Sequence, residues 1–341
     1  LHGSSVMAYI VSGGIAGGCA VPGVMATRTL RSPKERIATL LTAPFMNCGA
    51  KLPVFALLIA AFFPGNRTGM MFLLTLISWG GALLAAKLLR MTVVKGASTP
   101  FVMELPPYRL PTFRGLMIHT WERTWQYIKK AGTVILGISV LLWAAMTFPR
   151  LPDFQVADFD ARRGEIFSSV GSEVIAELQS PPGGQPLSAS AANVKSELKA
   201  MDNRQAGAAL RYSLAGRIGT AMESVSHWAG FDWRTNIALL GGIAAKEVIV
   251  SSLGTAYSLG EVDAEDAGSL SAKLAAEPGW RPLTAWSVIV FVMFYAPCFV
   301  TVVCIARESS WKWGAFSIVF NTALAFCLAV AVYQAGTLLG Y

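Results

Sequence analysis

Charged residues are scarce in this 341-residue chain. Only 14% of its residues are Asp, Glu, Lys or Arg, whereas 54% are hydrophobic and the mean hydropathy is +0.50. An average soluble domain has about a quarter charged residues, so water cannot cover this chain on all sides. The composition excludes an ordinary soluble domain and predicts a protein embedded in a lipid bilayer.

The motifs of several common enzyme classes are also absent. The sequence has no GxxxxGK[ST] phosphate-binding loop, no HExxH zinc motif, no GxSxG nucleophile elbow and no glycine-rich dinucleotide turn. Its three histidines have no metal-ligand spacing. We therefore expect a transporter module rather than an enzyme, with no permanently bound cofactor and no nucleotide hydrolysis in this chain.

No cysteine lies in the long polar stretch, which argues against an extracellular disulfide framework and predicts free thiols. The five are Cys19, Cys48, Cys298, Cys304 and Cys327. The net charge of +8 also needs no nucleic-acid partner. Lys and Arg concentrate in short connections between apolar runs, where membrane topology requires them.

Six apolar runs have about the 20 residues needed to span a hydrocarbon core of about 30 Å. They cover residues 37–63, 69–86, 131–148, 235–255, 283–306 and 313–339. Residues 6–26 form a further apolar run that is rich in glycine, which predicts either a full span or a broken helix. The predicted fold class is all-α, a polytopic helical membrane protein.

Basic clusters place residues 28–36, 87–130 and 307–312 on the cytoplasmic side. Within the second cluster, residues 111–130 predict an amphipathic helix on the inner surface. Residues 209–230 must return the chain between two outward crossings, which predicts a re-entrant or interfacial helix. Residues 150–208 are expected to form an exposed extracytoplasmic loop, which divides the chain into residues 1–149, 150–208 and 209–341.

Two segments of the chain form an internal repeat. GGCAVPGVMAT begins at Gly17 and GGIAAKEVIVS begins at Gly241, and each is followed by an Ala-Pro pair in the next apolar run. The basic residues orient the two segments in opposite directions, which is typical of inverted-repeat transporters with a substrate site near the midplane on interrupted helices. The predicted interruptions are Gly17, Gly18, Pro22, Pro44, Gly241, Gly242 and Pro297.

Glu247 and Lys246 lie within a predicted span. Each charge costs roughly 2.5 to 3.5 kcal/mol at the centre of a helix in a bilayer unless it faces a partner or a cavity. Ser251 and Thr255 share the helical face of Glu247, so these residues are candidates for lining a pathway. The structural alternative is an ion pair of Glu247 with Lys246 or with another helix.

Three cysteines lie within four residues of a proline: Cys19, Cys48 and Cys298. Interrupted helix exposes backbone carbonyls there. Sulfur together with carbonyls, Asn47 and the Met46 thioether suits a transition metal such as ferrous iron better than magnesium or calcium. The alternative is that each cysteine packs as a small hydrophobic residue, which is what we predict for Cys304 and Cys327.

Six segments jointly resemble the membrane region of the ferrous iron transport protein B family. They are GGCAVPGVMATRTL, RIATLLTAPFMNCGAKLPVF, PFVMELPPYRLP, HTWERTWQYIKKAGTVIL, ALLGGIAAKEVIVSSLGTAY and FYAPCFVTVVCIARESSWKWGAFS. The resemblance implies iron(II) uptake across the bacterial cytoplasmic membrane through two gate-like repeats similar to those of concentrative nucleoside carriers. It also implies metal handling by Cys19, Cys48, Cys298 and Glu247.

The family resemblance further implies an N-terminal domain that binds GTP and Mg and hydrolyses GTP. That domain lies outside this sequence, which opens at Leu1 and is expected to be a piece of a longer protein. A small cytosolic accessory protein and self-association are further expected partners, besides the lipid bilayer. The rival functions are an ion-coupled secondary transporter of nucleoside-like solutes and a membrane thiol enzyme, the latter disfavoured because no intramembrane histidine is available as base.

Overall fold

The computed structural model describes residues 18–30, 32–94, 112–168, 170–171, 189–257, 267–277 and 279–340. Every regular element in these ranges is helical, which confirms the predicted all-α class. Four described stretches are long and apolar enough to cross a membrane: Pro33–Phe62, Pro64–Thr92, Pro282–Glu308 and Trp311–Leu338. The chain is a multi-pass membrane protein.

The described residues up to 94 contain four α-helices, namely α2 (Ala20–Ala26), α3 (Pro33–Thr42), α4 (Leu52–Phe62) and α5 (Arg67–Thr92). The apolar run over residues 37–63 is not one continuous helix. The 3₁₀ turns Ala43–Phe45 and Gly49–Lys51 separate α3 from α4. The proline in the first turn removes a backbone donor, which favours the interruption.

The second half repeats this pattern of interrupted helices. The helices α11 (Trp233–Ala244) and α12 (Val248–Ala256) form one interrupted pair, and α14 (Pro282–Phe294) and α15 (Phe299–Glu308) form the other. The long helix α16 (Trp311–Leu338) packs along α14 and α15, and α15 also contacts α2. The main hydrophobic core is formed chiefly by α4 and α14, with further buried residues from α5, α11, α12 and α16.

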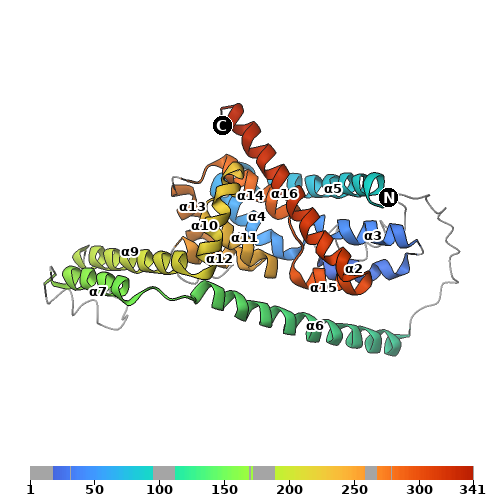
Figure 1. The fold of residues 1–341 in the computed structure, drawn as a ribbon, viewed down its shortest axis with the longest axis horizontal. Helices are drawn as coiled ribbons and strands as arrows, with labels where there is room; N and C mark the ends of the chain where they lie inside the picture. The colour runs from blue at the N-terminus through green and yellow to red at the C-terminus, as the bar shows by residue number, and fades with distance from the viewer. Residues whose placement is uncertain are drawn as a thin grey trace.

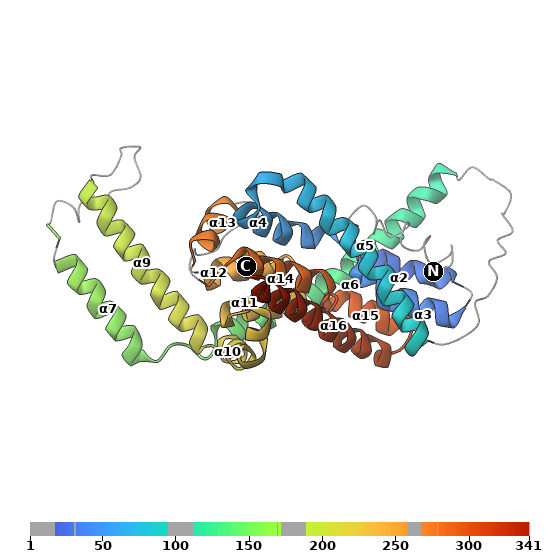
Figure 2. The ribbon, with the colours of Figure 1, turned by 90° about the horizontal axis from the view of Figure 1, so that it is seen from above.

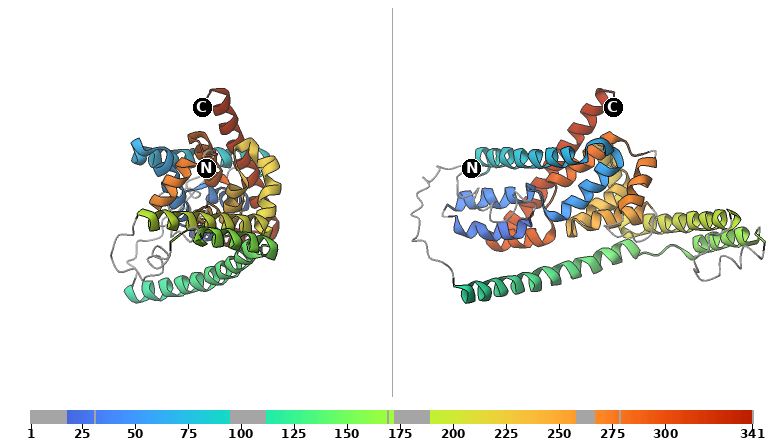
Figure 3. Two further views of the ribbon diagram at one scale, coloured as in Figure 1. Left: turned by 90° about the vertical axis from the view of Figure 1, so that its left-hand side faces the viewer. Right: turned by 180° about the vertical axis from the view of Figure 1, so that it is seen from behind.

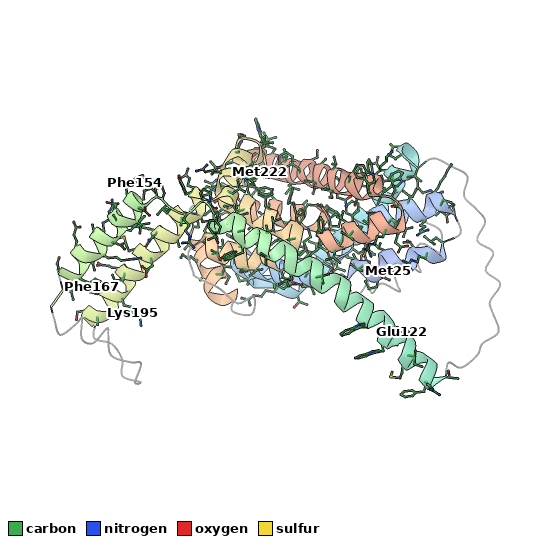
Figure 4. All side chains as sticks on the ribbon, turned by 60° about the horizontal axis from the view of Figure 1, so that its bottom comes forward. Met25, Glu122, Phe154, Phe167, Lys195 and Met222 are labelled. Carbon is green, nitrogen blue, oxygen red and sulfur yellow. The ribbon has the colours of Figure 1, made fainter. Side chains whose placement is uncertain are left out.

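Helix α6 (Phe113–Thr147) corrects a predicted boundary. The sequence predicted a surface helix over residues 111–130 and a separate span over residues 131–148, but the structure has one helix of 35 residues. No proline interrupts the segment, so the helix continues. At 1.5 Å per residue it is about 52 Å long, and Figure 4 shows the part that carries Glu122 extending away from the other helices.

The loop predicted for residues 150–208 is wrong in its described parts. The helices α7 (Asp153–Ser168) and α9 (Ala189–Tyr212) pack together as an arm, which projects from the remaining helices and carries Phe154 and Phe167 (Figures 2 and 4). The Arg163 guanidinium donates to Asp202 and Gln205 at 2.5 Å each. The predicted domain boundary at residue 208 falls inside α9, and the SPPGGQP sequence lies outside the described residues.

The segments that the sequence assigns to opposite sides of the membrane lie toward opposite ends of the molecule. The carboxyl end of α5, the amino end of α6 and the adjoining ends of α2 and α3 lie at one end, and the arm lies at the other with α13 (Ala267–Ala276) nearby (Figures 1 and 3). Residues 209–230, which were predicted to form a re-entrant or interfacial helix, contain α10 (Leu214–Ser226). With 13 residues, α10 is too short to span about 30 Å of hydrocarbon.

Candidate functional site

The amino ends of four helices meet around one cavity of about 380 Å³. Its wall is formed by the residues that precede or open α2, α4, α12 and α15. Two of these helices come from the first half of the chain and two from the second. The segments of the internal repeat therefore converge on a single space.

Three cysteines from distant parts of the sequence line this cavity, namely Cys19, Cys48 and Cys298. Each occupies the cap position at the amino end of a helical segment: α2, the 3₁₀ turn before α4, and α15. Backbone N–H groups at helix amino ends carry partial positive charge. Soft sulfur atoms therefore face a space in which the surrounding backbone stabilises negative charge.

Glu247 also lines the cavity and caps the amino end of α12. Within the described part of the chain it forms no ion pair, because Lys246 is directed elsewhere. The Lys246 Nζ donates to the Ala296 carbonyl at 2.8 Å and lies 2.9 Å from the centroid of the Tyr295 ring. The alternative of a Glu247–Lys246 ion pair is therefore wrong in this structure.

Lys51 is a site residue that the sequence interpretation missed. Its side chain is 2% exposed, and its Nζ donates to the carbonyls of Pro44 at 3.1 Å, Met46 at 3.3 Å and Met293 at 2.8 Å. A charged residue within an apolar run was the available signal, and the same criterion had singled out Glu247. Thr301 was also missed, and its Oγ1 lies 3.1 Å from the Cys298 Sγ.

Met46, Pro44, Pro297 and Lys246 line the cavity as well. Other candidates do not reach it: Asn47, Ser251 and Thr255 are outside its lining. Thr255 instead donates its hydroxyl to the Ser251 carbonyl at 3.1 Å, because both residues lie further along α12 than its amino end.

Several predicted interruptions are displaced. Gly241 and Gly242 lie inside α11, which continues to Ala244, so the break follows them. Pro22 lies in the first turn of α2, where the absent N–H is not needed. Gly18 precedes Cys19, the cap residue of α2, and Gly17 lies outside the described residues.

The cavity is not a closed metal cage. Among the described residues, no group of three His, Cys, Asp or Glu side chains is placed to hold a metal ion. A water molecule takes about 30 Å³ of liquid volume, so the cavity has room for a cation together with water. Such an arrangement can exchange part of a hydration shell for sulfur and oxygen atoms.

An ionic cluster joins the two halves at the ends of α2 and α15 that lie away from the cavity. The Glu308 carboxylate at the end of α15 accepts hydrogen bonds from Arg28 at 2.8 and 2.9 Å and from Arg36 at 2.8 Å. The hydrogen bond and the charge of Glu308 raise the pKa of Arg28 above its ordinary value. The cluster holds α15 against the region that connects α2 with α3.

Cys304 and Cys327 are outside the cavity lining, and they are free thiols like Cys48 and Cys298. Cys304 packs beside a small cluster that contains Val24 and Leu40. Cys327 is exposed on α16. The different placement of Cys298 and Cys304 follows from their spacing, since six residues on a helix turn a side chain to another face.

Two family models match the chain. The model described as "Ferrous iron transport protein B C terminus" matches residues 71–123. The Gate model, described as "Nucleoside recognition", matches residues 1–62 and 128–312. The Gate match therefore includes all four segments that line the cavity.

Curated relatives match over nearly the whole chain. A Porphyromonas gingivalis protein named Fe(2+) transport protein A/Fe(2+) transporter FeoB fusion protein is 35% identical over 99% of this chain and 38% of its own length. The Fe(2+) transporter FeoB of Helicobacter pylori strain J99 is 34% identical over 99% of this chain and 49% of its own. The chain thus spans about half the length of such relatives or less, and no solved structure matches it.

Proposed function

Because the chain belongs to the ferrous iron transport protein B family, we propose that it forms the membrane passage through which iron(II) enters a bacterial cell. One observation carries the proposal. Cys19, Cys48, Cys298 and Glu247 come from separate segments and line one cavity at the amino ends of four helices. Sulfur and carboxylate oxygen together suit a divalent transition metal.

In the proposed mechanism, iron(II) is the substrate and enters the cavity from the outer side with part of its water shell. Thiol sulfur and backbone oxygen at the helix interruptions replace some of these waters. Glu247 then provides a negative charge toward the cytosolic exit. Because the ligands form no closed cage among the described residues, the ion is held briefly and released.

The full-length protein is proposed to couple this passage to GTP. A GTP-binding domain with Mg, located outside this chain, would control the passage in the bacterial cytoplasmic membrane. The relative from Porphyromonas gingivalis is named as a fusion with Fe(2+) transport protein A, which supports a small accessory protein as a partner. Self-association is a further part of the proposal.

Uptake of labelled iron(II) into cells without their own iron importer tests the proposed function. The variants are Cys48→Ser and Glu247→Gln in the protein at its natural length, with Cys327→Ser as a matched control outside the cavity. At equal membrane abundance, we expect the first two to lose uptake by roughly tenfold or more and the control to retain it. Undiminished uptake by both cavity variants would contradict the assignment of this cavity.

A second candidate is ion-coupled import of nucleoside-like solutes, which the description of the Gate model favours. It predicts uptake of labelled uridine that collapses with the sodium or proton gradient and ignores iron. Three thiols around the cavity offer weak hydrogen bonding to a base or a ribose. The same cells, given labelled uridine, distinguish the two candidates.

A further inference from the structure

Lys51 occupies a cage of backbone carbonyls beside the cavity. Its Nζ lies 2.8 to 3.3 Å from three carbonyl oxygens, those of Pro44, Met46 and Met293. Three acceptors require three donors, which an ammonium group has and a neutral amine lacks. The charged form of Lys51 is therefore the form that this geometry holds.

These three carbonyls belong to helix ends. Pro44 and Met46 follow α3, and Met293 is in the last turn of α14. Carbonyls at helix carboxyl ends have no partner within their own helix and carry partial negative charge. Rings of backbone carbonyls also replace water around cations in membrane pathways, so the cage has the chemistry of a cation site.

Lys246 repeats the arrangement at the break between α14 and α15. Its side chain is 3% exposed, and its ammonium lies on the Ala296 carbonyl and the face of the Tyr295 ring. Both contacts are typical of a bound cation. Lys51 and Lys246 thus bring two positive charges to a cavity that also has one carboxylate, Glu247.

We propose that the Lys51 ammonium is a tethered cation that fills a backbone-carbonyl site in the pathway, and that a divalent cation must displace it to pass. The inference rests on the proposed function, because it assigns a gate to the same cavity. Because like charges repel, the Lys51 ammonium keeps other cations out of the cavity. A cation enters when its binding to the sulfur and oxygen ligands outweighs this repulsion. The long, flexible lysine stem allows the head group to move aside.

Passive entry of Mn²⁺ into proteoliposomes that contain the natural-length protein and an internal metal-sensitive dye tests this gate. Lys51→Gln removes the charge but keeps two N–H donors for the carbonyls, whereas Lys51→Arg keeps the charge. Lys87→Gln is the matched control, since Lys87 is exposed on α5. We expect Lys51→Gln to admit Mn²⁺ roughly tenfold faster than the wild type, and the other two variants to match the wild type.

The outcomes separate a gate from a helix cap. If Lys51 is only a structural cap, Lys51→Gln should admit Mn²⁺ no faster than the wild type once thermal unfolding has shown that the variant is folded. That result would overturn the gate. If the wild-type protein imports iron(II) while Lys51→Gln admits Mn²⁺ no faster than the wild type, only the gate fails. If Lys51→Gln opens to Mn²⁺ while wild-type protein never imports iron(II), the gate stands and the proposed cargo fails.

A measurement on the wild type covers the case in which Lys51→Gln does not fold. The buried Lys51 amine should resist an acylating reagent in metal-free buffer and become labelled when Mn²⁺ is added, as read by peptide mass spectrometry. Lys87 provides the internal reference for reagent strength. Labelling of Lys51 that does not change with Mn²⁺ overturns the proposal.

Discussion

At the scale of single residues, the two buried lysines show how this protein tolerates charge in an apolar interior. An unpaired ammonium there would cost several kcal/mol. Lys51 and Lys246 are each placed on carbonyl oxygens that helix interruptions leave available. The lysine ammonium groups thus supply donors to the free carbonyls, and the carbonyls supply acceptors to the ammonium groups. This pairing explains why buried lysines and helix interruptions occur together at the cavity.

The glycine pair in α11 gives a residue-scale prediction. A Cβ on Gly242 would lie 2.1 Å from the Tyr295 hydroxyl and 2.5 Å from Ile249, whereas a Cβ on Gly241 would meet its nearest neighbours at 3.1 Å. Tyr295 is buried and cannot swing aside. We expect Gly242→Ala to lower the free energy of unfolding by about 1 to 3 kcal/mol.

Gly241→Ala is the matched control for Gly242→Ala. Its added methyl group meets contacts that small shifts relieve, and alanine favours helix by up to about 1 kcal/mol over glycine. We therefore expect the stability of Gly241→Ala to stay close to that of the wild type. Thermal unfolding in detergent measures both variants, and equal melting temperatures would show that α11 does not approach Tyr295 this closely.

The sequence identified residue types at the site better than their packing. Glu247 and the cysteines beside prolines were recognisable because charge or sulfur near an interruption is unusual in a span. The glycines at 241 and 242 were interpreted as a helix break, although α11 continues through both. Their close approach to Tyr295 depends on a contact between distant segments, which no local pattern contains.

At the scale of elements, the three interruptions in the described residues have different origins. Prolines at 44 and 297 lie at two of them, and the sequence predicted both places. The break at 245–247 contains neither proline nor glycine. There the Lys246 side chain reaches the Ala296 carbonyl, so a tertiary contact accompanies a break that local propensity does not predict.

The predicted loop over residues 150–208 was wrong for a related reason. Helix α9 is polar on most of its surface and has no long apolar stripe, so its sequence resembles a solvated linker. Contacts with α7, including those of Arg163 with Asp202 and Gln205, stabilise it as a helix. Helices in folded proteins gain most of their stability from such packing.

The ionic cluster at the end of α15 gives an element-scale prediction. Glu308 is buried and binds two arginines, Arg28 and Arg36. Glu308→Gln leaves both without their counter-charge, and because Arg28 is about half exposed, water recovers part of the loss. We expect the free energy of unfolding to fall by roughly 1 to 3 kcal/mol.

Glu277→Gln is the matched control for that substitution. Among the described residues, the Glu277 carboxylate pairs with Arg234 alone, at 3.0 Å, and both side chains are about one-third exposed. Pairs of that kind contribute about 0 to 1 kcal/mol. Thermal unfolding in detergent should therefore rank Glu308→Gln below Glu277→Gln, and the reverse order would show that the cluster does not fasten α15.

At the scale of the whole molecule, the structure separates a cavity-forming body from the arm of α7 and α9. Every segment that lines the cavity precedes or opens α2, α4, α12 or α15, and Figure 2 shows the arm projecting from these helices. The overall all-α class and the convergence of repeats were predictable, because hydropathy and basic residues fix crossings. The arm was not, because the packing of α7 against α9 depends on contacts that no local sequence pattern contains.

Shortening the arm tests this separation. Replacing residues 165–201 with four Gly and Ser residues rejoins the helices where Arg163 contacts Asp202. Such a linker has an end-to-end distance of about 11 Å, which matches the 8 to 10 Å between packed helix axes. We expect iron(II) uptake to stay within about twofold of the wild type, because exposed tips tolerate such changes.

The same linker inserted after Ala245 is the control, and it should abolish uptake by separating α11 from α12. Loss of uptake in the protein with the shortened arm, at equal membrane abundance, would assign the arm a part in transport.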